Sequence, residues 1–244
     1  MSENEFLDVI AVGAHPDDVE IACGGTLAKL VKQGHRVGII DLTDGEPTPL
    51  TSGPEERMEE ARKAAECLGV HTRVTMDLPN RKLFDNYEAR VKLATLFRKY
   101  RPKVVIGFGD KTPMASPDHW QAMQITDAAV FYSRLTKWDD QFEGTSPHTI
   151  SAQVYFRLSY EPNMMGGTGS GFTVNIGSTL EQKMDSIRCY QSQFPQHKQH
   201  ILDRIESIAV TLGAACSYKA GESFVTTRPL GTRNFMQTLL GTPD

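Results

Sequence analysis

The chain has 244 residues, enough for one α/β domain with a substantial core or for two small domains. Its 26 Lys and Arg residues against 30 Asp and Glu residues give a formal net charge of −4, which argues against general nucleic-acid binding. No apolar run approaches the roughly 20 residues of a membrane span, so we expect no membrane association.

The cysteines and the N-terminus indicate the compartment. Cys23, Cys67, Cys189 and Cys216 form no C-x-x-C pair, and each falls in a stretch that we predict to be helical. A buried free thiol is the usual arrangement in such stretches. The acidic N-terminal segment is unlike a signal peptide, so we expect a cytoplasmic protein in a reducing environment.

The first predicted elements are a strand at Val9–Val12 and a helix at Val19–Gln33. The first is a short apolar run rich in β-branched residues, and the second repeats apolar residues at helical spacing. Between them, His15, Asp17 and Asp18 crowd into four positions. The crevice beyond the carboxyl end of a strand is where open α/β sheets bind ligands, so this turn is a candidate site.

These residue types suit a catalytic zinc site. His15 offers an imidazole nitrogen and Asp18 a carboxylate oxygen, both ordinary zinc ligands, and Asp17 would lie beside the metal. The same residues also fit a plain helix start, in which Asp17 and Glu20 form a capping-box-like pattern. Catalytic zinc usually has three protein ligands and one open position, so a third ligand is needed.

The rest of the first half alternates strands with helices. The predicted strands are 37–42, 74–78 and 104–108, and the predicted helices are 55–68, 87–100 and 121–135. This alternation predicts βαβ units and a parallel sheet. Right-handed crossovers would place the carboxyl ends of the first and fourth strands on the same edge. His119 follows the fourth strand and supplies the missing ligand there.

The second half is less regular. We predict strands at 152–158 and 172–176, helices at 179–193 and 198–216, a glycine-rich loop at 161–171, and a tail at 221–231 with one short strand. The loop matches no P-loop pattern, so we expect a lid or an oligomer contact there rather than a phosphate cradle. A dinucleotide site is disfavoured as well, because the first turn lacks G-x-G-x-x-G and presents two acids.

Together these elements predict an α/β, Rossmann-like fold. A mainly parallel sheet would be flanked by helices, with an irregular α+β C-terminal portion. We expect one domain over 1–244, in which 1–137 form the βα core with the metal motifs and 138–244 form a substrate or oligomer portion.

The motifs His-Pro-Asp-Asp at 15–18 and Pro-Asp-His at 117–119 resemble those of the zinc-dependent N-acetylglucosamine deacetylase superfamily, also called LmbE-like or PIG-L-like. The resemblance covers nearly the whole chain. Further counterparts are the acidic helix ending in Leu-Gly at 57–69, the Leu-Pro-x-Arg turn at 78–81, KMDSIRCYQSQF at 183–194 and GESF at 221–224. These later features look most like the bacillithiol-pathway branch, which deacetylates N-acetylglucosaminyl malate.

The resemblance implies roles for individual residues. His15, Asp18 and His119 would hold the metal, and Asp17 would be the general base. Asp118 would orient a ligand or cap the following helix. The implied reaction is hydrolysis of the acetamide of an N-acetylglucosamine conjugate to acetate and a free amine. Zinc is the expected cofactor, and iron(II) is the alternative because two histidines and one carboxylate suit both metals.

Substrate contacts are also implied. Arg57 and the Asn80-Arg81 turn fall where substrate-contacting residues occur in this family, although a solvated helix arginine and a plain turn explain them equally well. Asn80 and Asn175 stand where aspartates are common. The expected partner is a small amino-sugar substrate, and since family members are commonly oligomeric, we expect a homo-oligomer.

One departure concerns catalysis. The second family motif usually reads His-Pro-Asp-His, and its leading histidine is thought to stabilise the oxyanion, but here that position is Ser116. A hydroxyl can donate a hydrogen bond but carries no positive charge, and losing an oxyanion donor costs on the order of 10²–10³ in rate. Lys111, assigned to substrate binding, or His197 or His200 could replace the lost charge.

Two alternative functions stay open from the sequence. One is an amidase that acts on another acylated amino sugar or on a thiol conjugate. The other is a non-catalytic metal- or sugar-binding relative, which the serine at position 116 favours. The retained Asp17 argues against the second alternative, because binding alone would not require it.

Overall fold

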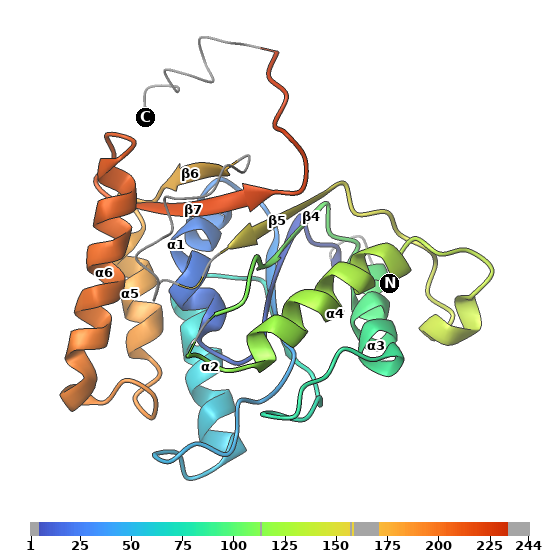
Figure 1. The fold of residues 1–244 in the computed structure, drawn as a ribbon, viewed down its shortest axis with the longest axis horizontal. Coiled ribbons are helices and arrows are strands. Elements are labelled where there is room, and N and C mark those ends of the chain that lie inside the picture. The colour runs from blue at the N-terminus through green and yellow to red at the C-terminus, as the bar shows by residue number, and fades with distance from the viewer. Residues whose placement is uncertain (1–4, 113, 157, 159–170, 234–244) are drawn as a thin grey trace.

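The computed structural model describes residues 5–112, 114–156, 158 and 171–233, and its centre is a seven-stranded sheet in the order β3-β2-β1-β4-β5-β7-β6 (Figure 1). The strands are β1 Val9–Gly13, β2 Val37–Asp41, β3 Thr72–Thr75, β4 Val104–Phe108, β5 Ala152–Phe156, β6 Gly171–Asn175 and β7 Gly221–Thr226. Strands β1 to β5 pair in parallel, whereas β7 runs antiparallel to β5 and to β6. The predicted mainly parallel α/β sheet is therefore confirmed.

Two groups of helices cover this sheet (Figure 1). The helices are α1 Asp18–Lys32, α2 Pro54–Leu68, α3 Tyr87–Tyr100, α4 Asp118–Tyr132, α5 Leu180–Arg188 and α6 Gln199–Ala214, with short 3₁₀ turns η2 Asp139–Phe142 and η4 Gln196–Lys198. Helices α1, α2, α5 and α6 pack together, and α3 packs on α4. Among the described helices, none is long and apolar enough to cross a membrane.

The strand order fixes where a site can form. All five residues of β1 and of β2 are buried, as expected for parallel strands covered on both faces. From β1 the chain continues toward β2 and β3, whereas from β4 it continues the other way to β5. The carboxyl ends of β1 and β4 therefore flank the point at which the winding reverses, where such sheets bind ligands.

Several predicted boundaries were wrong. The strand predicted at 74–78 lies at Thr72–Thr75, and the helix predicted at 121–135 spans Asp118–Tyr132. The helix predicted at 179–193 ends at Arg188, because Tyr190 turns into the core and donates to Glu20 at 2.7 Å. Most of the glycine-rich loop lies outside the described residues.

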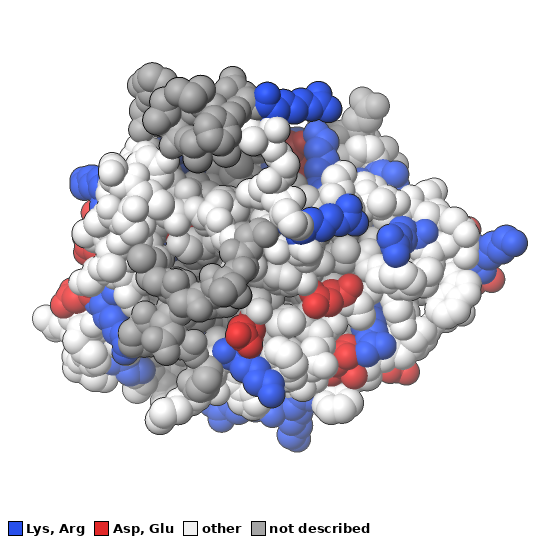
Figure 2. All heavy atoms as spheres, turned by 45° about the horizontal axis from the view of Figure 1, so that its top comes forward, with Lys and Arg blue, Asp and Glu red and all other residues white. Residues whose placement is uncertain are grey.

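Two further observations concern the distribution of charged side chains on the surface and the burial of the four cysteines. Basic and acidic side chains are interspersed on the face in Figure 2. Cys23 is buried as predicted, but Cys67 and Cys189 are half-buried and Cys216 is exposed. The prediction that all four thiols are buried in helices was therefore wrong. Cys189 and Cys216 lie beyond the ends of α5 and α6, and Cys67 lies within α2 but is only half-buried.

Candidate active site

The turn between β1 and α1 is organised around the Asp18 carboxylate. Its Oδ2 accepts hydrogen bonds from the backbone N–H groups of Ala14 at 3.0 Å and His15 at 2.9 Å. A Cβ at Gly13 would lie 3.2 Å from three heavy atoms of this turn, so a glycine suits the close approach. Asp17 adopts φ 119°, a left-handed conformation that costs a non-glycine residue about 1–3 kcal/mol. The hydrogen bonds of Asp18 thus stabilise a turn in which Asp17 has a left-handed backbone conformation.

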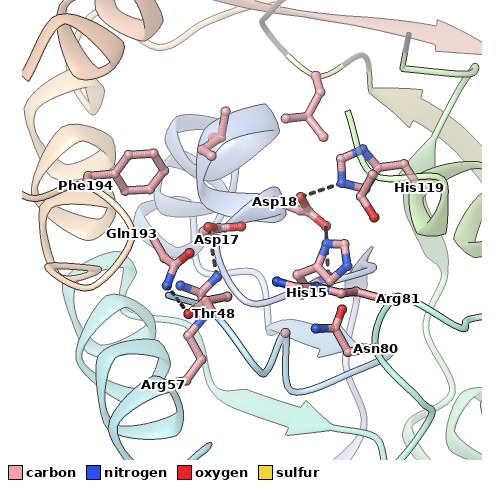
Figure 3. Close-up of a pocket in the computed structure, with 14 residues that line it drawn as sticks. His15, Asp17, Asp18, Thr48, Arg57, Asn80, Arg81, His119, Gln193 and Phe194 are labelled. Carbon is pink, nitrogen blue, oxygen red and sulfur yellow. Dashed lines mark hydrogen bonds and ion pairs between the residues drawn. The ribbon is translucent and has the colours of Figure 1, made fainter. Parts of the chain in front are cut away.

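Three donor side chains from two distant segments meet at this turn (Figure 3). One ligand atom each from His15, Asp18 and His119 lies within 4.8 Å of the other two. His119 Nε2 is 3.3 Å from Asp18 Oδ1, and His15 Nδ1 is 3.4 Å from Asp18 Oδ2. Two imidazole nitrogens and a carboxylate oxygen are a donor set that suits zinc or iron(II). The predicted convergence of the three residues is present.

Each imidazole is held by a second partner. Asp118 Oδ2 accepts from His15 Nε2 at 3.3 Å, and Thr112 Oγ1 is hydrogen-bonded to His119 Nδ1 at 2.7 Å. Histidines that bind metals almost always have such a partner on the other ring nitrogen, which fixes ring orientation. Asp118 therefore stands where a ligand-orienting carboxylate would. Thr112 was missed because a single threonine in a loop carries no signal.

The cluster also brings opposite charges face to face. Burial by itself would lower the pKa of His15, but hydrogen bonds to Asp118 and Asp18 outweigh it and raise that pKa to about 10. Burial by itself would raise the pKa of Asp18, but the charges and hydrogen bonds of His119 and His15 hold it far below its usual range. A cation bound here would compete with the proton on His15.

Asp17 is paired with a buried arginine. Arg57 Nη2 donates to Asp17 Oδ2 at 2.9 Å and to the carbonyl oxygen of Pro16. Only 2% of Arg57 is exposed, and its guanidinium lies 5.1 Å from the ring centroid of Tyr190, so it is not a solvated helix arginine. Burial raises the pKa of Asp17 to about 6, against the opposing charge of Arg57 and with the charge of Asp18 adding to the rise.

A cavity of about 270 Å³ opens over this cluster. Its lining residues are His15, Asp17, Asp18, Ile21, Gly45, Thr48, Arg57, Asn80, Arg81, Ser116, His119, Leu158, Gln193 and Phe194. All of the predicted site residues except Lys111 and Asp118 are among them. Asn80 Nδ2 donates to the carbonyl oxygen of Glu46 at 2.8 Å, which places the turn against the loop after β2.

The residues proposed to replace the missing histidine lie elsewhere. Lys111 is exposed, with Nζ 5.0 Å from the ring centroid of Trp120, and the exposed His197 and His200 belong to η4 and α6. None of the three lines the cavity. Ser116 does line it, and its Oγ accepts from the backbone N–H of Asp118 at 3.3 Å. The hydroxyl oxygen is the acceptor in this bond, so the bond does not use the hydroxyl proton.

One wall of the cavity was not predicted. Gln193 and Phe194 reach it from the turn after α5, and Gln193 Nε2 donates to Thr48 Oγ1 at 3.0 Å (Figure 3). Thr48 comes from the loop after β2. The helical spacing of residues 179–193 concealed this turn, since it predicted a helix through the same positions.

Sequence comparison places the chain among known proteins. It is 31% identical over 229 residues to the diacetylchitobiose deacetylase of Thermococcus kodakarensis, covering 90% of this chain and 82% of that protein. The chain belongs to the PIG-L/LmbE-like deacetylase family. The family profile described as GlcNAc-PI de-N-acetylase (PIG-L) matches residues 10–130, which include His15, Asp18 and His119. The predicted superfamily is confirmed, and the bacillithiol branch stays a prediction.

Solved structures show how widely this family's fold is used. The conserved protein TT1542 from Thermus thermophilus superimposes with a TM-score of 0.82 at 29% identity, covering 94% of this chain and 99% of that one. GalB, the 4-carboxy-2-hydroxymuconate hydratase of Pseudomonas putida, has a TM-score of 0.78 at 20% identity, covering 93% and 98%. Because a hydratase shares the fold, the fold alone does not identify the reaction.

Proposed function

We propose that this protein is a metal-dependent hydrolase that removes the acetyl group from an N-acetylglucosamine-containing conjugate, releasing acetate and a free amine. The observation that carries the proposal is the meeting of His15, Asp18 and His119 with Asp17 beside them in one cavity. The similarity to a diacetylchitobiose deacetylase supports the same reaction class.

The proposed metal is zinc, with iron(II) as the alternative. When bound, such a metal lowers the pKa of water toward about 7 and polarises a carbonyl group. His15, Asp18 and His119 would hold it, since their donor atoms lie close enough together and suit its chemistry. Asp118 and Thr112 would keep the two imidazoles in orientation through the bonds described above.

Asp17 is proposed to move the protons. It would accept a proton from the attacking water and then give it to the departing amine, because an amide anion is too basic to leave unprotonated. Arg57 holds the Asp17 carboxylate in a fixed direction, and burial brings its pKa closer to neutral, which suits a group that both accepts and donates. Ser116 would donate a hydrogen bond to the tetrahedral oxyanion.

The proposed substrate is N-acetylglucosaminyl malate. The cavity of about 270 Å³ is slightly smaller than the usual range for small-molecule sites, about 300–1,000 Å³, which suits a single sugar ring near the metal. Asn80 and Arg57 offer polar groups to the sugar, and the exposed Arg81 offers a cation to the malate carboxylates. Another acylated amino sugar or a thiol conjugate is the alternative substrate.

Acetate release from a small panel tests the proposal. The panel contains N-acetylglucosaminyl malate, N-acetylglucosamine and diacetylchitobiose, and metal content is measured on the same samples. We expect acetate from the malate conjugate above all. If only another member reacts, the substrate assignment is wrong and the reaction class stands. If metal is bound but no member releases acetate, the non-catalytic binding protein is the better interpretation.

The variant Asp17→Asn tests the general base. We expect it to keep its metal and to lose about 10²–10⁴-fold in turnover, the usual contribution of a general acid–base residue. Asp77→Asn is the matched control, because Asp77 is exposed and pairs with Lys92 away from the cavity. Near-normal deacetylation by Asp17→Asn would remove Asp17 from this role.

A further inference from the structure

Two cysteines lie side by side at the contact between α2 and α5. Cys67 is in the last turn of α2, Cys189 follows the last residue of α5, and their sulfur atoms are 3.6 Å apart. A disulfide needs a sulfur separation of about 2.05 Å, so a combined shift of about 1.5 Å would join them. We propose that these thiols are a redox modification site, at which hydrogen peroxide forms a reversible intramolecular disulfide.

The other two thiols of the chain do not share this arrangement. Cys23 is fully buried within α1, where no oxidant reaches it, and Cys216 is exposed beyond α6. Cys67 and Cys189 are half-buried, so a molecule as small as peroxide reaches them while each still has a partner within a short movement. The contact joins positions 122 residues apart in the sequence.

The surroundings assign a different part to each sulfur. The Cys189 thiol donates to the carbonyl oxygen of Asp185 at 3.4 Å, and burial together with the neighbouring Cys67 raises its pKa to about 12. Because the Cys189 proton is held by the Asp185 carbonyl oxygen, we assign the first reaction with peroxide to Cys67. Cys189 then acts as the resolving thiol.

The reaction balances with peroxide as the only oxidant. The Cys67 thiolate attacks one peroxide oxygen, the O–O bond breaks, and the departing hydroxide takes the proton that Cys67 had released, giving a sulfenic acid and one water. The Cys189 sulfur attacks the Cys67 sulfur, the S–O bond breaks, and the departing hydroxide takes the Cys189 proton as a second water. Two thiols lose two electrons in total, and one peroxide becomes two waters.

The link would act on a wall of the cavity. Cys189 begins the turn that carries Gln193 and Phe194 to the cavity, and Ser192 in this turn is already bonded to Glu60 of α2 at 2.6 Å. A covalent bond at Cys189 would fasten the start of the turn to the same helix. We therefore expect slower amide exchange over residues 190–194 and an unfolding midpoint at higher urea, since the link restricts the unfolded chain.

The experiment uses the full chain with Cys216→Ser, which prevents the exposed thiol from linking two copies. After peroxide treatment, non-reducing peptide mapping should find Cys67 joined to Cys189, with two fewer cysteines open to alkylation, and dithiothreitol should restore both. The oxidised protein should show the raised urea midpoint and the slower exchange. Cys67→Ser and Cys189→Ser, each in this background, are controls that should show neither change.

Three results would overturn the proposal. The first is that both sulfurs stay open to alkylation after peroxide, and the second is that each becomes a sulfinic acid without a link. The third is a cross-link that forms only between molecules. The mapping needs no substrate and no metal, so its outcome is independent of the proposed deacetylation. A thermal melt of each serine variant verifies that the control is folded.

Discussion

Replacing Glu222 by alanine is expected to lower the free energy of unfolding by about 3–5 kcal/mol, the usual cost of removing one partner of a buried ion pair. Glu222 lies on β7 and is 2% exposed. Its Oε1 accepts from Lys183 Nζ at 2.5 Å and from the backbone N–H of Gly25 at 3.0 Å, and its Oε2 accepts from that of Thr26 at 2.7 Å. Alanine would leave a buried ammonium and two buried amides without these acceptors.

A double-mutant cycle separates the ion pair from the rest of the site. Lys183 is 1% exposed, so Lys183→Met in the Glu222→Ala background removes a charge that would otherwise be buried and unpaired. We expect the double variant to be more stable than the sum of the single losses predicts, by about 0.5–3 kcal/mol. The exposed pair of Arg188 and Glu181 on α5 is the control, and Glu181→Ala should change stability by no more than about 0.5 kcal/mol.

Urea unfolding followed by circular dichroism measures these differences. The slope of the free energy with urea should stay constant across the variants, so that shifts of the midpoint report stability. A loss below about 1 kcal/mol for Glu222→Ala, or strictly additive losses in the cycle, would refute the reasoning that Glu222 neutralises a buried charge. Either result would mean that water or a local rearrangement replaces the carboxylate.

Four further predictions concern the metal, the oxyanion and the packing. Asp118→Asn should weaken metal affinity about 10–100-fold in a chelator competition, whereas Asp110→Asn, in the exposed loop between β4 and α4, should not change it. Chelation should lower the melting temperature, and zinc at about 100 times its Kd should restore about 2.7 kcal/mol; a melt unaffected by metal would contradict a site in the folded state. Ser116→His should raise kcat for acetate release by about 10-fold or more, and an unchanged kcat would mean that the serine is no handicap. Gly213→Ala should lower the free energy of unfolding by about 1–3 kcal/mol, because the added Cβ would lie 2.4 Å from the backbone of Ala220. In Gly24→Ala the added Cβ would have its nearest neighbour at 3.6 Å, so this control should change the free energy of unfolding, measured in urea, by no more than about 1 kcal/mol.

The parts of the fold that were predictable from sequence are those in which the local residue pattern matches the burial that the whole fold imposes. Strands β1, β2 and β4 are covered on both faces, which requires mainly apolar residues at successive positions. These short apolar runs are easily distinguished from the flanking segments, in which apolar residues recur at helical spacing. The meeting of His15, Asp18 and His119 was predictable for a related reason. Each lies in the segment that follows a strand, and the strand order alone determines which of these segments share an edge.

The cavity wall was not predictable, because tertiary contacts override a helical pattern there. Residues 179–193 repeat apolar positions at helical spacing, yet α5 ends at Arg188. The hydrogen bonds of Tyr190 to Glu20 and of Ser192 to Glu60 reach residues more than 130 positions away. No local pattern reveals such partners. The direction of Lys111 is a similar case, since a loop side chain turns toward whichever neighbour offers a contact, here the ring of Trp120.

Arg57 shows how the sequence and the structure combine to define the surroundings of one residue. The sequence allowed a solvated helix arginine or a substrate contact, but the side chain is buried and bonded to Asp17 and to the Pro16 carbonyl. Asp17 has φ 119°, a conformation that persists only when its surroundings hold it. The Asp18 carboxylate holds the turn from within, through the N–H groups of Ala14 and His15, and Arg57 holds it from α2. The orientation of the Asp17 carboxylate therefore depends on a contact with a residue 40 positions away in the sequence. A substitution at Arg57 should displace Asp17 more than it displaces the three proposed metal ligands.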